Sequence, residues 1–253
     1  MRLTPGGPCV GFVTPLGGPA SGISPLGGDV GVPTPSCRQA LNFSDCFAQC
    51  EGVINKVSPG PVCGWTFAQA FGDLAGQISF SPGVMRFETV SPTDFPGALK
   101  TPGVEVGSIY GTTSEFDFHE FPGPLTANVT YSMVVMNKDG SEGLLIELIG
   151  NLVIVEFGGP ATAPLYTGVW NPNHGFHKFF VTISKNGVPR AWVDGVEIEL
   201  ELFGEVVSIF SFFNPNTINL YLGSEDTNPV SAEVTKAVFT AGIYPSETVF
   251  CCP

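Results

Sequence analysis

Apolar and polar positions alternate most clearly along residues 176–198. Phe179, Val181 and Ile183 occupy every second position of one run, which is the period of a β-strand whose two faces differ. An Asn-Gly turn at 186–187 follows, the chain runs back through 191–193, and an Asp-Gly turn leads into 196–198. Pro189 donates no hydrogen bond and therefore suits the start of a strand or an edge. The pattern predicts a β-meander.

The same short runs recur from Trp65 to the end of the chain, and no long stretch has helical periodicity. Turn sequences such as those at 81–83, 137–140 and 150–151 separate them and favour hairpins. A series of short strands of this kind predicts an all-β, two-sheet antiparallel jelly-roll sandwich over residues 64–253. The further strands are expected at 65–71, 77–80, 84–90, 115–121, 130–137, 143–149, 152–157, 206–213 and 219–223.

Residues 1–36 have a different pattern, in which a Ser/Thr-Pro dipeptide recurs every ten residues. The dipeptides begin at Thr4, Thr14, Ser24 and Thr34, and Gly pairs follow three of them. Proline favours extended backbone, and paired glycines permit turns and close approach to another backbone. The repeat predicts an extended Pro/Gly-rich arm that lies against neighbouring subunits; a flexible linker is the alternative.

Residues 37–63 form a Cys-rich connector. Cys46 and Cys50 would lie four apart on a short helix expected over Asp45–Val53, with Ser44 as its cap. The spacing of the connector's cysteines does not match a zinc site, so buried thiols or disulfides are expected. Cys251-Cys252 could reach this cluster if the first and last strands are neighbours. The connector's cysteines are Cys37, Cys46, Cys50 and Cys63.

Composition excludes several classes of function. The net charge of −13 repels phosphate backbones, so a nucleic-acid partner is not expected. No apolar run reaches about 18 residues, which argues against a membrane span. The first residues lack the apolar core of a secretory signal, so we expect synthesis in a host cytoplasm. If the cysteines are oxidised, this happens in an assembly that leaves the cell.

The residues of the meander also carry a resemblance to a known superfamily. A His, an apolar strand, a turn and an aromatic-Val-Asp-Gly step resemble the signature of concanavalin A-like jelly rolls. This superfamily includes laminin-G-like and pentraxin-like modules, legume lectins and laminarinase-type glycosidases, so the resemblance implies a fold more than a function. The matching segments are His177, 179–183, 192–195, 219–224 and 237–244.

One stretch, residues 114–121, is a candidate active site. Glu115 and Asp117 share a face of a strand, and a bulge at His119 would bring Glu120 onto that face. This Glu-x-Asp-x-x-Glu pattern resembles the catalytic strand of the laminarinase family, which implies Glu115 as nucleophile, Asp117 as its partner and Glu120 as acid/base. The Arg-rich stretch and the cleft tryptophans of that family are missing. The alternative is simple alternation with Phe116 and Phe118 inward and the acids solvated or at a subunit contact, and we expect no catalysis.

Other acidic residues offer a calcium site, because several jelly-roll lectins bind this ion through carboxylates and carbonyls. The candidates are Asp139, Asp194 and Asp226, although aspartates in turns commonly cap their own turn. His174 and His177 lack a third ligand in the sequence. No cofactor other than calcium is indicated.

Three classes of function remain. The first, which we favour, is a non-enzymatic structural protein of a virion, such as a capsid decoration (cement) or tail protein of a bacteriophage. Its partners would be further copies of itself and capsid or tail proteins. The second is a lectin-like attachment module that binds glycans. The third is the retaining glycosidase of Glu115 and Glu120.

Overall fold

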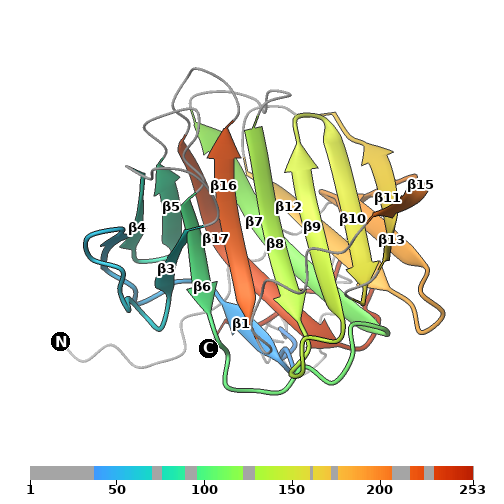
Figure 1. Ribbon diagram of the computed structural model, residues 1–253, viewed down its shortest axis with the longest axis horizontal. Helices are drawn as coiled ribbons and strands as arrows, with labels where there is room; N and C mark the ends of the chain where they lie inside the picture. Colours follow the sequence, from blue (N-terminus) through green and yellow to red (C-terminus); the bar gives the residue numbers. More distant parts are fainter. Residues whose placement is uncertain are drawn as a thin grey trace, which may run out of the picture.

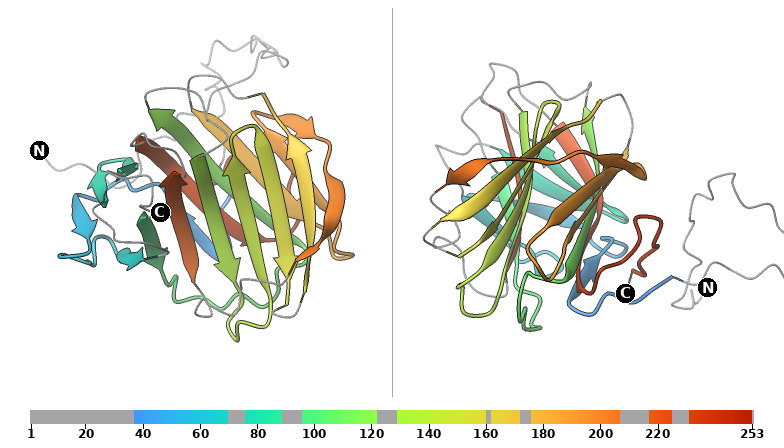
Figure 2. Two further views of the ribbon diagram at one scale, coloured as in Figure 1. Left: turned by 45° about the horizontal axis from the view of Figure 1, so that its top comes forward. Right: turned by 90° about the vertical axis from the view of Figure 1, so that its right-hand side faces the viewer.

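The computed structural model describes residues 37–69, 76–88, 96–121, 129–159, 162–171, 176–206, 217–224 and 231–252. Within these ranges the chain is built of strands and turns. Figure 1 shows two layers, and Figure 2 shows them edge-on as the halves of a sandwich. No helix in the described ranges is long and apolar enough to cross a bilayer. The predicted arm, residues 1–36, lies outside the described residues.

The first layer, here called the β7 sheet, has the strand order β14-β13-β12-β7-β17-β5-β4-β2, with β1 pairing β17. Its neighbouring strands pair antiparallel. Its strands are β1 Phe43–Asp45, β2 Gly52–Asn55, β4 Gln77–Ser81, β5 Val84–Glu88, β7 Thr112–Phe121, β12 His177–Ile183, β13 Pro189–Val193, β14 Val196–Ile198 and β17 Ser231–Ala241.

The second layer, the β9 sheet, has the order β15-β11-β10-β9-β8-β16-β6-β3 and is likewise antiparallel. Its strands are β3 Thr66–Gln69, β6 Pro96–Lys100, β8 Val129–Met136, β9 Gly143–Ile149, β10 Leu152–Gly158, β11 Ala163–Val169, β15 Glu201–Val206 and β16 Ile218–Ser224.

The predicted meander is confirmed as β12, β13 and β14. Pro189 is the first residue of β13, opposite Ile183, where its missing N–H costs least. Asp194 and Gly195 both have positive φ, 51° and 80°, as a two-residue hairpin turn of the mirror-image type requires. The local turn chemistry was therefore sufficient to place these strands.

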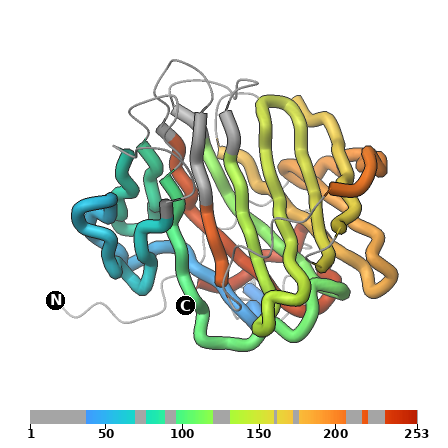
Figure 3. Tube along the Cα trace, viewed as in Figure 1, coloured from blue at the N-terminus to red at the C-terminus, as the bar shows by residue number. Residues whose placement is uncertain are grey.

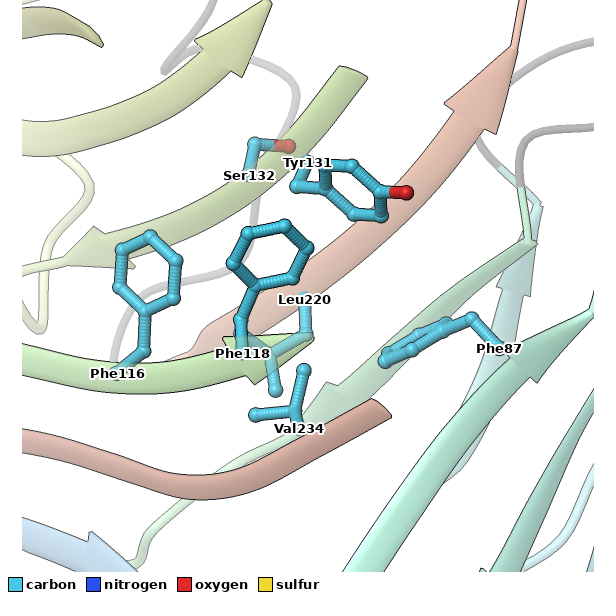
Figure 4. A pocket seen from close by; sticks show the side chains of 7 residues that line it. All are labelled: Phe87, Phe116, Phe118, Tyr131, Ser132, Leu220 and Val234. Carbon is cyan, nitrogen blue, oxygen red and sulfur yellow. The ribbon is translucent and has the colours of Figure 1, made fainter. Parts of the chain in front are cut away.

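The core lies between the two sheets and is rich in aromatic rings. Phe116 and Phe118 of β7 point into it, as predicted, and stack near Phe179 of β12 at centroid distances of 5.2 and 5.8 Å. Phe118 also contacts Tyr131 of β8 across the sandwich at 4.4 Å. A cavity of about 10 Å³ beside these rings (Figure 4) could hold at most about one water molecule. Within the described residues the rings form a packed core, and this cavity is too small for a ligand larger than water.

The short helix expected over Asp45–Val53 is wrong. Asp45 ends β1, and its Oδ1 accepts a hydrogen bond from the Phe47 N–H at 2.8 Å, which caps a turn instead of a helix. Phe47 has φ of 55° and is fully buried. The need to bury this ring and to bring Cys50 to Cys63 outweighs the local helical pattern.

Other boundaries also differ from expectation. The sequence analysis did not predict the strands β1, β2, β6 and β11. A strand was expected at 206–213, but β15 ends at Val206, and residues 207–213 lie outside the described residues. The closing strand β17 begins earlier than the expected 237 and ends at Ala241, where Gly242 turns with φ of 101°. Figure 3 traces the described chain from its blue first strands to the red strand β17, and the Cys37–Cys251 bond joins its two ends.

Candidate functional site

The predicted acids lie on the outer face of the β7 sheet. Glu115 and Asp117 alternate with the inward Phe116 and Phe118, so they share one face as expected. Asp117 lies between Lys178 of β12 and Lys236 of β17 in the strand register. The structure thus brings together two carboxyl groups and two amines, of which the sequence analysis had identified only the carboxyl groups.

Glu115 is buried, with 1% of its side chain exposed, and it pairs with both lysines. Lys236 Nζ lies 2.7 Å from its Oε1 and Lys178 Nζ lies 3.3 Å from its Oε2. The expectation that this acid is solvated is therefore wrong. A buried carboxylate requires such cationic partners, because desolvation of an unpaired charge is costly.

The C-terminal segment, residues 242–252, covers this face (Figure 2). Lys178 Nζ donates hydrogen bonds to the carbonyls of Ser246 and Thr248, both at 3.0 Å. Phe250 packs with Phe180 of β12 and Val238 of β17 in a small apolar cluster on the same face. The segment therefore contributes both polar and apolar contacts to the closure above Glu115.

Three disulfides lie in the described part of the chain, and two of them hold its ends together. Cys37–Cys251 and Cys46–Cys252 join the connector to the C-terminal segment, and Cys50–Cys63 closes a loop within the connector. The two long-range bonds bring together residues that are 214 and 206 positions apart. The predicted proximity of Cys251-Cys252 to the connector is confirmed, and the cover of Glu115 is covalently tethered at its end.

Asp117 is half-buried, and its Oδ1 is shielded from solvent without a hydrogen-bond partner. Desolvation, reinforced by the negative charge of Glu115, raises the pKa of Asp117 to about 7, although Lys236 and Lys178 oppose the shift. This raised pKa does not fit the solvated acid that simple alternation along the strand predicts. A carboxyl group of this kind can hold a proton near neutral pH.

Glu120 is not brought to this face by a bulge at His119. The register along β7 is continuous there, and the extra residue lies in β17 between Val234 and Lys236. Glu120 pairs with Ala232 through the backbone, and its side chain is not among those that the structure describes.

The calcium candidates are dispersed. The Asp139 carboxylate accepts hydrogen bonds from the side chain and the backbone N–H of Ser141; these bonds cap the turn and lower the pKa of the carboxyl. Asp194 contacts His177 Nδ1 at 2.8 Å and accepts from the Lys178 N–H at 2.9 Å. Asp226 and His174 lie outside the described residues. Within the described ranges, no three His, Cys, Asp or Glu side chains gather in a way that could hold a metal ion.

A second buried acid, Glu156 of β10, escaped the sequence analysis. It is 5% exposed on the outer face of the β9 sheet, in register with Leu145 and Leu165, and desolvation raises its pKa to about 7. Its one sequence signal is a charge inside an otherwise apolar strand. Lys178 and Lys236 gave a similar weak signal, and only the register joined them to Glu115.

Comparison with known proteins identifies the fold. No known family model and no curated protein sequence matches the chain. A structure described as a native glycosidic hydrolase is 14% identical with a TM-score of 0.52, and the match covers 82% of this chain and 100% of that one. A β-1,3-glucanase from Mycobacterium marinum is 16% identical with a TM-score of 0.50, over 81% and 100% of the two chains.

A third similar structure is the binding domain of botulinum neurotoxin DC in complex with rat synaptotagmin II. It is 11% identical with a TM-score of 0.50, and the match covers 73% of this chain and 45% of that one. The chain thus spans less than half the length of this toxin domain. At these identities the likeness shows the fold alone: the chain has a concanavalin A-like jelly-roll fold, as the meander residues indicated.

Proposed function

We propose that the chain is a non-catalytic structural protein of an assembly exposed outside the cell, of the type of a bacteriophage capsid decoration or tail protein. The observation that carries this proposal is the closure of the candidate active face. Glu115 is buried, paired with two lysines and covered by a segment that disulfides tether. A glycosidase needs its carboxylates beside an open sugar-binding groove.

The disulfides support an oxidising destination. Six cysteines are paired, whereas the thiols of cytoplasmic proteins are normally kept reduced. Cys37, the first described residue, is one of them, so the chain passes from residues 1–36 into the sandwich at a covalently fixed point. A repetitive arm attached to such an anchor suits contacts between subunits.

Deletion of residues 1–36 tests this proposal. We expect the truncated chain to fold, with an unchanged unfolding temperature, but to fail to incorporate into the native particle. Occupancy is measured by quantitative mass spectrometry of purified particles, with full-length protein as control. Incorporation of the truncated chain at normal occupancy would contradict the assembly role.

A retaining glycosidase is the second candidate, and the raised pKa of Asp117 beside Glu115 favours it. The likeness to a glycosidic hydrolase and a β-1,3-glucanase supports the same class. Incubation of the full chain with β-glucans, followed by a reducing-sugar assay, separates the two functions. We expect no release; activity that Glu115→Gln abolishes, while the folded spectrum is retained, would establish the glycosidase.

A lectin-like attachment module would be another non-catalytic role for this fold. The likeness to a toxin binding domain supports recognition of a partner in general. A glycan array screened with and without EDTA distinguishes this role, because a carboxylate-bound calcium site would make binding sensitive to the chelator.

A further inference from the structure

The strand β15 is the terminal strand of the β9 sheet in the described part of the chain. It pairs with β11 on one side only. A terminal strand presents backbone N–H and C=O groups along its other side, and these can pair with an added strand. The side chains of β15 therefore determine what this edge can bind.

Two large apolar side chains of β15 lie in solvent. Phe203 is 77% exposed and Leu202 is 61% exposed. The register passes from Leu165 opposite Gly204 to Tyr166 opposite Leu202, so Phe203 is the extra residue of a β-bulge. Val169 of the neighbouring β11 is also exposed, at 65%. Large exposed apolar side chains on two adjoining strands make this edge a candidate interaction site.

The same edge is acidic. Glu199, Glu201 and Glu205 are exposed, and none of them forms an ion pair with another described residue. The cation beside this edge, Arg190, is already engaged by both oxygens of Glu197 at 2.7 Å. Negative charge along β15 is therefore available to a cationic partner.

The connection from β14 to β15, residues 199–200 and here called the crossover, fixes the position of this edge. This crossover lies directly on Gly168 of β11, where an added Cβ would come within 2.5 Å of Ile198 Cγ2 and 2.8 Å of the Glu199 carbonyl oxygen. Ile198 is itself part of the main core. The backbone of β15 is thus presented by a packed support, which lowers the ordering cost of binding.

The acidic charge of β15 argues against two possible binding partners, a second copy of the chain and residues 1–36. A second copy pairing through β15 would set Glu201 and Glu205 against the same acids, and like charges opposed in a sheet are destabilising. Residues 1–36 contain one cation, Arg2, balanced by Asp29, and their prolines lack the N–H groups of a ladder. Neither offers complementary charge.

We propose that the edge of β15 is a docking site for an extended, cationic segment of another protein, which adds to the β9 sheet as a further strand. Its lysines or arginines pair with Glu199, Glu201 and Glu205, and its apolar residues pack against Phe203 and Leu202. This inference does not depend on the assembly role.

The test uses the full chain and two fluorescein-labelled, end-blocked peptides. One is Lys-Val-Thr-Lys-Val-Thr-Lys-Val, and the other has Glu in place of each Lys. We expect the Lys peptide, but not the Glu peptide, to bind the wild-type chain. Fluorescence anisotropy measures this binding, which should weaken at high salt. Hydrogen exchange should show new protection of the β15 amides on binding.

Charge reversal supplies the specificity control. The double variant Glu201→Lys/Glu205→Lys should bind the Lys peptide about tenfold or more weakly than wild type does, and it should gain binding of the Glu peptide. The double variant Glu51→Lys/Glu247→Lys makes the same charge change at exposed sites elsewhere and should bind as wild type. Phe203→Ser should also lose binding. All five substituted sites are exposed, and thermal melts verify the fold.

The outcomes decide the matter either way. Absence of Lys-peptide binding to wild type up to about 1 mM overturns the proposal. Equal weakening by the two double variants shows a nonspecific charge effect and overturns it as well. Wild-type binding by Phe203→Ser, or no protection in β15, removes the strand-addition mode.

Discussion

Glu115 is a structural charge whose removal leaves two amines without their shared partner. Lys236 and Lys178 retain only 12% and 29% of their side-chain exposure, so an uncompensated positive charge there is poorly solvated. The sequence alone predicts a Glu115 that is solvated or at a subunit contact, and a Glu115→Gln substitution that is nearly silent in assembly. In the structure Glu115 lies buried on the outer face of the β7 sheet, beneath the C-terminal segment, and pairs with both lysines.

We therefore predict that Glu115→Gln lowers the free energy of unfolding by about 3–5 kcal/mol, the usual cost of breaking a buried pair from one side. Urea denaturation measures it. Glu197→Gln, which breaks the exposed pair with Arg190, is the matched control and should have little effect. Similar effects of both substitutions would show that Glu115 is well solvated.

Asp117 and Glu156 should make the protein less stable as the pH rises. Burial holds the pKa of each carboxyl at about 7 in the folded state, whereas in the unfolded chain each titrates near its usual value of about 4. Between these values the folded state binds more protons. Stability is therefore full below about pH 4 and falls towards pH 7, by up to about 1.4 kcal/mol per pH unit and group.

Asp117→Asn and Glu156→Gln test this linkage, because each amide stays neutral. Each variant should match wild type near pH 4 and exceed it in stability at pH 8, as measured by denaturant unfolding at pH 4, 6 and 8. A difference between variant and wild type that does not change with pH would show that folding does not raise the pKa of that carboxyl.

At the scale of elements, Gly168 determines how the chain passes from one sheet to the other. The crossover backbone at Glu199 and the side chains of Ile198 and Leu200 occupy the space that a Cβ at Gly168 would need. An alanine there must push the crossover away from β11. Such overpacking typically costs about 1–3 kcal/mol.

Gly168→Ala should thus lower the unfolding temperature, and it should loosen β15, measured as faster amide hydrogen exchange in residues 201–206. Gly204→Ala is the control, because a Cβ at Gly204 meets nothing within 4 Å. If both substitutions behave alike, close approach at Gly168 is not what fixes the crossover.

At the scale of the whole molecule, the two long-range disulfides join both ends of the described chain over the outer face of the β7 sheet. Each closes a loop of more than 200 residues, so each removes substantial entropy from the unfolded chain. Together they keep the C-terminal segment over Glu115.

Replacing Cys37 and Cys251 together by Ser should lower stability by about 2–5 kcal/mol. It should also increase hydrogen exchange in the C-terminal segment. Non-reducing peptide mass spectrometry of wild type should recover Cys37 linked to Cys251 and Cys46 linked to Cys252. Full alkylation of the thiols without reductant would contradict the bonds.

Much of the fold could be predicted because its rules are local. Alternation and turn chemistry located β12, β13 and β14, the inward direction of Phe116 and Phe118, and the all-β class. Local rules failed where distant packing decided the outcome. At Asp45 to Val53 a helical pattern yielded to the burial of Phe47 and to the Cys50–Cys63 bond.

The candidate site was predicted in its residues but not in its state. The sequence alone determined that Glu115 and Asp117 share a face, because a strand has a period of two. Only the tertiary structure decided that this face is closed. Lys178, Lys236 and the C-terminal segment reach Glu115 through strand pairing and disulfides between residues far apart in the chain. Burial and charge pairing depend on such distant neighbours, and no local pattern encodes them.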